Sequence, residues 1–85
     1  MKTIWKLSLK GDRTEVCVPA GAHMLTAQML DGCPTVWAMV DLEAPPVNLA
    51  LVCYGTADDL PEDPGYCVGT MQDGGVARHV FVEAV

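Results

Sequence analysis

Two short runs of the chain, residues 34–41 (PTVWAMVD) and 48–54 (NLALVCY), are apolar at most positions. Because side chains alternate along a β-strand, each run would be apolar on both faces if it formed a strand. Such a strand belongs in the middle of a sheet or beneath a partner, where both of its faces are covered. The two runs therefore predict central strands of a small all-β domain.

The other apolar runs alternate with polar residues, which is the period of a half-buried strand. They cover residues 3–9, 14–19, 23–30, 66–71 and 76–85. The run 23–30 also contains good helix formers, but the tight Asp31-Gly32 turn that follows it favours a strand. We predict one domain over residues 1–85, an antiparallel barrel or sandwich of about seven short strands.

Turn and loop residues predict how these strands are connected. Gly11-Asp12-Arg13 and Asp31-Gly32 each predict a hairpin between the two runs on either side, and Asp73-Gly74-Gly75 predicts another hairpin turn. Residues 42–46 and 55–65 contain prolines and acids and are predicted to be surface loops. A glycine inside a strand, as at position 69, predicts a bulge or a close approach of another backbone.

The apolar content of the chain is high for its size. Of its 85 residues, 51% are hydrophobic and only 19% are charged. A domain this small buries only about 60% of its unfolded surface, so some apolar surface stays exposed or lies in an interface. We expect a homo-oligomer, a dimer or higher, and place Trp37 and Met39 at the interface between its subunits.

The charge is negative overall, −6, and unevenly distributed. Residues 1–13 hold four cations and one acid, net +3, and the remainder holds one arginine and ten acids, net −9. This balance disfavours direct binding to nucleic acid. An acidic surface made of Asp41, Glu43, Asp58, Asp59, Glu62 and Asp63 could instead contact a basic protein. Its simpler role would be to keep the domain in solution.

Four cysteines, at positions 17, 33, 53 and 67, lie too far apart for a CxxC motif. The first residues lack the apolar run of a secretory signal, and no run approaches the roughly 20 apolar residues of a membrane span. We therefore expect reduced cysteines in a cytoplasmic protein and no contact with a membrane.

Residues with catalytic or ligand-binding chemistry are few. Ser8 is the only serine, and no local motif brings His23 or His79 to a cysteine. Residues 58–63 lack the spacing of a calcium-binding loop, and no phosphate-binding glycine motif is present. We predict no enzyme activity, no metal site and no cofactor.

Several segments of the chain together resemble a known family. They are residues 1–6 (MKTIWK), 19–22 (PAGA), 37–41 (WAMVD), 54–56 (YGT), 60–64 (LPEDP), 68–70 (VGT) and 79–81 (HVF). In this order they resemble a family of small uncharacterised phage and prophage proteins, from which the four cysteines are a departure. The resemblance implies a viral or mobile-element origin, the cytoplasm of a bacterial host, and no cofactor or catalytic residue.

Two hypotheses of different classes follow. The first is a non-enzymatic phage accessory protein that binds a host protein or complex and inhibits a defence system, as an anti-CRISPR protein does, with the acidic surface facing a basic target. The second is an oligomeric sponge that sequesters a nucleotide second messenger. The nucleotide would lie in pockets between subunits, and its ligand-binding residues would be Lys6, Lys10, Arg13 and Arg78, with an aromatic residue such as Trp5 or Tyr54. A structural phage component is a third alternative.

Overall fold

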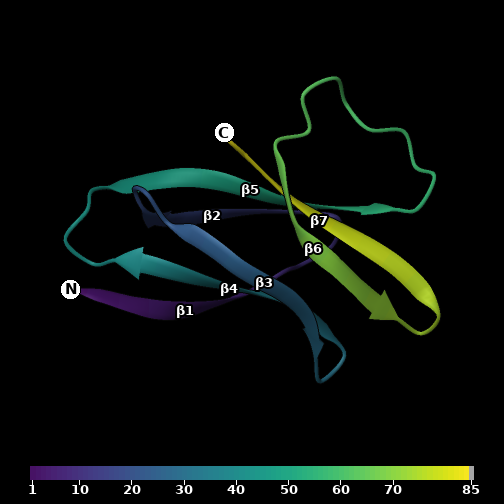
Figure 1. Ribbon diagram of the computed structural model, residues 1–85, viewed down its shortest axis with the longest axis horizontal. Helices are drawn as coiled ribbons and strands as arrows, with labels where there is room; N and C mark the ends of the chain where they lie inside the picture. The colour runs from purple at the N-terminus through teal and green to yellow at the C-terminus, as the bar shows by residue number, and fades with distance from the viewer. Residues whose placement is uncertain (85) are drawn as a thin grey trace.

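The alternating runs of the sequence form seven β-strands in the computed structural model, which describes residues 1–84 (Figure 1). In chain order they are β1 (Lys2–Ser8), β2 (Arg13–Pro19), β3 (His23–Leu30), β4 (Cys33–Asp41), β5 (Pro46–Gly55), β6 (Tyr66–Asp73) and β7 (Val76–Ala84). The predicted all-β fold of seven short strands is confirmed, and 23–30 is a strand rather than a helix. Val85, the last residue of the predicted final strand, lies outside the described residues.

The strands form two antiparallel sheets that pack face to face. The smaller sheet has the order β1-β4-β3, and the larger has the order β2-β5-β7-β6. The sheets do not close into a barrel, so the sandwich alternative of the prediction is the correct one. β4 and β5 are flanked on both sides, as expected for strands that are apolar on both faces.

Two of the three predicted hairpins are confirmed. β3 and β4 are joined by Asp31 and Gly32, with φ angles of 50° and 77°. Two positive φ angles are what a tight two-residue hairpin turn requires. β6 and β7 are joined in the same way by Gly74 and Gly75.

The predicted opening hairpin is wrong, because β1 and β2 do not pair. β1 pairs with β4, and β2 pairs with β5. The connection after β1 carries the chain from the smaller sheet to the larger one. It is held there by the backbone N–H of Cys53, which donates to the carbonyl of Asp12 at 2.8 Å. Both segments are strands, as their alternation predicts, but alternation does not specify the partner strand.

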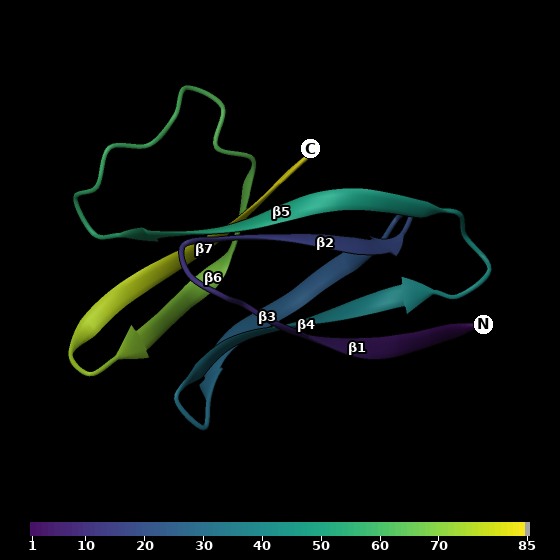
Figure 2. The ribbon, with the colours of Figure 1, turned by 180° about the vertical axis from the view of Figure 1, so that it is seen from behind.

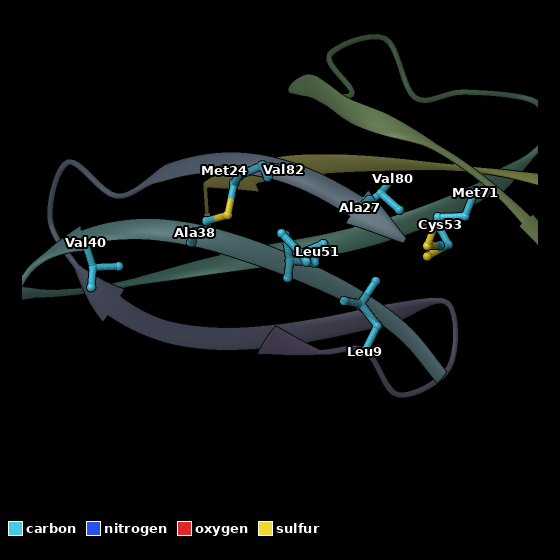
Figure 3. Close-up of a cluster of buried hydrophobic side chains, with 11 residues drawn as sticks. Leu9, Met24, Ala27, Ala38, Val40, Leu51, Cys53, Met71, Val80 and Val82 are labelled. Atoms are coloured by element: carbon cyan, nitrogen blue, oxygen red, sulfur yellow. The ribbon is translucent and has the colours of Figure 1, made fainter. Parts of the chain in front are cut away.

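The core fills the space between the two sheets (Figure 3). From β4 it receives Val36, Ala38 and Val40, all completely buried. Leu51 of β5 and Val80 of β7 face them from the larger sheet and are also completely buried. The inward-facing positions are therefore the ones that the two-residue period predicts.

Local irregularities adjust the strands to each other. The register of β6 against β7 shifts between Cys67 and Gly69, which confirms the bulge predicted at this glycine. A side chain at position 69 would touch Ala27 of β3, so the glycine also marks a close approach of the two sheets. A second shift, between Met24 and Thr26 of β3, was not predicted.

The loops lie where the prolines and acids predict them. The β4–β5 connection is a loop as predicted, except that Pro46 opens β5, opposite Pro19 at the end of β2. The β5–β6 loop, residues 56–65, projects from the sandwich at the end of β5 that is distant from the N-terminus (Figures 1 and 2).

Candidate functional site

The β5–β6 loop exposes a group of acidic side chains. Asp58, Asp59, Glu62 and Asp63 are all solvent-exposed, as is Leu60 between them. None of the four carboxylates forms an ion pair with another side chain of residues 1–84. The loop therefore presents unneutralised negative charge around one apolar side chain.

The start of this loop is fixed by hydrogen bonds to the sheet. The backbone N–H of Gly55 donates to Asp58 Oδ2 at 2.7 Å, and the N–H of Asp58 donates to the Gly55 carbonyl at 3.2 Å. Thr56 Oγ1 lies 2.8 Å from Nε2 of His79 on β7. These contacts hold the first turn of the loop against the larger sheet.

The other end of the loop is fixed by a glycine. Gly65 has a φ of +82°, which favours glycine. A Cβ at this position would lie 1.9 Å from the backbone oxygen of Val82 on β7. Only a residue without a side chain allows the loop to return to the sheet along this path.

A pocket of about 220 Å³ lies where the loop meets the outer face of the larger sheet. Its lining consists of Tyr54, Gly55, Thr56, Ala57, Asp58, Leu60, Cys67, His79 and Phe81. The rings of Tyr54 and Phe81 are 5.6 Å apart and inclined at 78°. The pocket thus combines aromatic and apolar groups with one hydroxyl, one thiol, one imidazole and one carboxylate, and its lining contains no lysine or arginine.

His79 is held on both sides of its ring. Nε2 contacts the hydroxyl of Thr56, and Nδ1 contacts the hydroxyl of Thr70 at 2.9 Å. A neutral imidazole has one donor and one acceptor nitrogen, so these two hydroxyls occupy both. The thiol of Cys67 lines the same pocket but is directed to the Gly69 carbonyl, 3.8 Å away. The arrangement positions a histidine rather than activating a nucleophile.

The structure separates the acidic residues that the sequence grouped into one surface. Asp41 and Glu43 lie beside the N-terminal ammonium, at 3.5 and 3.1 Å, where β4 leads into β5. The loop acids follow the far end of β5, a ten-residue strand that spans about 30 Å. The pKa of Asp41 is lowered, first by a hydrogen bond from the backbone N–H of Glu43 and then by the N-terminal charge. The two groups form separate acidic sites.

Within a single chain, the residues proposed to hold a nucleotide do not converge. Lys6 is exposed on the outer face of β1, and Trp5, beside it, packs against the core on the inner face. Lys10 lies in the β1–β2 connection, where its backbone N–H donates to Thr14. Of this set, only Tyr54 lines the pocket.

Both arginines of that set are paired with acids. Arg13 forms an ion pair with Glu83 and approaches Glu15 at 3.8 Å. Arg78 lies 2.8 Å from Asp12 and 3.9 Å from Asp73. Because each arginine charge is already balanced by an acid within the fold, little positive charge remains to attract a phosphate.

Trp37 and Met39, predicted at a subunit interface, lie on the outer face of the smaller sheet. Met39 is 38% exposed, and Ile4, directly opposite it on β1, is 59% exposed. Leu25, at the bulge of β3, is 43% exposed. We call Ile4, Leu25, Trp37 and Met39 the outer apolar strip.

Sequence reasoning missed most of the pocket. Alternation along each strand places His79 and Phe81 on one face of β7 and Tyr54 on one face of β5. That these faces coincide, and that the loop folds over them, depends on the register of β5 against β7, which places Tyr54 opposite His79. No pattern within either segment reveals this pairing.

Two further features of residues 1–84 concern metals and membranes. No group of three or more histidine, cysteine, aspartate or glutamate side chains is arranged to hold a metal ion. This part of the chain also has no helix long and apolar enough to cross a membrane.

Comparison with known proteins gives one match. The family model of a domain of unknown function, DUF7352, matches residues 1–85. No curated protein and no solved structure matches the chain. The description of the family does not mention phage, so the resemblance to phage proteins stays a prediction. The chain belongs to the DUF7352 family.

Proposed function

We propose that the chain is a non-enzymatic binding domain that uses the β5–β6 loop to contact a basic surface of a partner protein. The proposal rests chiefly on the exposed carboxylates of Asp59, Glu62 and Asp63, which have no ion-pair partner within residues 1–84. Opposite charges on two surfaces accelerate their association and select the correct partner.

The loop is suited to this role because it is already held in place. Hydrogen bonds fix Gly55, Thr56 and Asp58, and Gly65 fixes the return to the sheet. Two prolines in the loop reduce the number of conformations that binding would have to restrict. Exposed Leu60 would add an apolar contact within the charged surface.

The biological setting that we propose comes from the resemblance to phage and prophage proteins. In this setting the domain is an accessory protein in the cytoplasm of a bacterial host and inhibits a defence complex, as an anti-CRISPR protein does. A defence complex that holds nucleic acid has a basic surface, which the loop would cover. The domain itself would not bind nucleic acid.

The nucleotide-sponge alternative has weaker support. A phosphate is bound by cationic side chains, but Arg13 and Arg78 are paired with acids. The pocket beneath the β5–β6 loop has an aspartate and no lysine or arginine in its lining, and a neighbouring pocket that contains Arg78 is also lined by three aspartates.

The experiment is a capture of partners from host lysate with three forms of the protein. The first is unaltered, the second carries Asp59→Lys, Glu62→Lys and Asp63→Lys, and the control carries Asp41→Lys and Glu43→Lys at the distant acidic site. We expect the same protein to be captured by the unaltered and control forms and lost with the loop variant. Capture by all three forms, or loss with both variants, would contradict the assignment of the loop.

We also propose self-association through the outer apolar strip. Trp37→Asp places a charge on this face and is expected to lower the mass of the particle in analytical ultracentrifugation. An unchanged particle mass would show that the strip is not the interface between subunits.

A further inference from the structure

We infer that the pocket beneath the β5–β6 loop binds an organic cation, an alkylammonium or guanidinium group. This inference extends the proposed function. It rests on that function in one respect only, namely that the cation belongs to a side chain of the partner protein.

The aromatic walls come from adjacent strands. Tyr54 of β5 and Phe81 of β7 are both half-buried, and their rings meet edge to face at 5.6 Å. Because the rings are inclined at 78°, the pair offers two walls of different orientation. The faces of aromatic rings attract ammonium and guanidinium groups, more strongly when water is partly excluded.

The carboxylate is Asp58. Its Oδ2 accepts the Gly55 N–H at 2.7 Å, which fixes the side chain at the pocket. A carboxylate can accept about four hydrogen bonds, so Asp58 retains most of its capacity for a cationic ligand. Asp58 has no ion pair among residues 1–84.

The rest of the lining excludes other classes of ligand. With no lysine or arginine, it has no cation that would hold a phosphate or a carboxylate. His79 has both ring nitrogens occupied by Thr56 and Thr70. Around the pocket, the exposed acids of the loop raise the local concentration of cations.

The size of the pocket also limits the ligand. Pockets for drug-sized molecules are about 300–1,000 Å³, whereas this one is about 220 Å³. It can hold the end of a lysine or arginine side chain, or a small free amine. A nucleotide would extend far beyond it.

The primary test is a titration of the folded protein followed by NMR of its backbone amides. The probes are N-acetyl-arginine amide and tetramethylammonium, with the matched citrulline compound as a neutral control that keeps the shape of arginine. We expect both cations to shift the amides of residues 54–58, 79 and 81, and citrulline to leave them unchanged. Equal shifts with citrulline, or no shifts with either cation, would overturn the inference.

Two variants separate the contribution of charge from that of shape. Asp58→Asn keeps an oxygen that can accept the Gly55 N–H and removes the charge. We expect it to weaken binding of tetramethylammonium by roughly fivefold or more. Asp59→Asn removes a charge from the same loop outside the pocket lining, and we expect it to weaken binding by less than about twofold. Equal effects of the two variants would mean that only the overall charge of the loop matters.

Phe81→Leu tests the aromatic wall, with circular dichroism used to verify that the variant is folded. We expect a folded Phe81→Leu protein to lose affinity for the cations. If it binds them as tightly as the unaltered protein does, the aromatic contribution is refuted.

The source of the cation is distinguished by adding excess tetramethylammonium to the partner capture. Release of the partner identifies a partner side chain as the ligand, and continued capture identifies a free amine. Probe binding without a captured partner would support the cation pocket and contradict the proposed function. A captured partner without probe binding would support the proposed function and contradict the cation pocket.

Discussion

β4 and β5 have almost the same sequence pattern but end in different surroundings. Each is the apolar centre of its sheet, and each buries one face in the core. The outer face of β5 is covered as well, with Ala50 0% and Val52 9% exposed. The outer face of β4 is partly open, with Met39 38% exposed.

The difference arises from the flanking strands. On the larger sheet, Arg13 lies opposite Val52 on one side of β5, and Glu83 lies opposite Ala50 on the other side. Their ion pair joins β2 to β7 across the outer face of β5. Tyr54 and Phe81 continue this cover toward the pocket.

No such bridge crosses β4. Its neighbours at Met39 are Ile4 on β1 and His23 on β3, and at Trp37 they are Lys6 and Thr26. No ion pair within residues 1–84 joins β1 to β3. A strand that is apolar on both faces thus indicates a central position, but the side chains of its neighbours decide whether its second face is covered.

The largest difference in stability between the two outer faces is expected when a charge is placed on each of them in turn. Ala50→Asp puts a carboxylate in a covered position between Glu15 and Glu83 and should lower the free energy of unfolding by about 3–5 kcal/mol. Met39→Asp, on the face that is open in a single subunit, should cost the folded subunit itself about 1 kcal/mol or less. Urea denaturation measures both. Equal losses would show that the two faces do not differ in burial.

Two glycine-containing connections should also differ. Gly65 lies in the β5–β6 loop within the larger sheet, and Gly21 lies in the β2–β3 connection between the two sheets. Gly65→Ala forces a Cβ against the backbone of β7 at a positive φ and should cost about 2–4 kcal/mol. Gly21→Ala meets only the positive φ, because nothing lies within 4 Å, and should cost about 1 kcal/mol. Thermal unfolding of the two variants tests this order, and a more stable Gly65→Ala protein would contradict it.

A smaller effect is expected from the ion pair itself. Arg13→Gln removes the bridge across β5 and should lower the urea midpoint slightly, since both side chains are partly exposed. Lys6→Gln, on the flank of β4, removes a charge that has no ion-pair partner among residues 1–84 and should leave the midpoint unchanged. The prediction fails if Lys6→Gln is the more damaging change.

The smallest effect on stability is expected from pH, through the thiol of Cys53. Cys53 of β5 is buried, and burial raises the pKa of its thiol. The stability that depends on the neutral thiol is therefore complete below the ordinary thiol pKa of about 8.5 and declines as the pH rises toward the higher folded value.

The thiols of Cys53 on β5 and Cys33 on β4 should differ clearly in reactivity. Cys33 of β4 is only half-buried. In a Cys17→Ser, Cys67→Ser protein at pH 8, we expect Cys33 to react with a thiol reagent well before Cys53. The order is read by mass spectrometry of digested protein, and faster labelling of Cys53 would refute the contrast between β4 and β5.

The amino-acid sequence by itself determined the local structure. The two-residue alternation specified the strands and their inward faces, since burial must follow the direction of side chains along a strand. Asp31-Gly32 and Gly74-Gly75 specified their hairpins because few residues adopt positive φ angles. The prolines and acids of residues 56–65 specified an exposed loop.

Only the tertiary structure decided which distant strands became neighbours. β1 and β2 have sound strand patterns and a turn between them, yet each pairs with another strand, because alternation is satisfied by any partner that covers the same face. The pocket depends on the register that sets Tyr54 beside His79, and the cover of β5 depends on Arg13 reaching Glu83, 70 residues away. These contacts join residues far apart in the chain, and no local pattern encodes them.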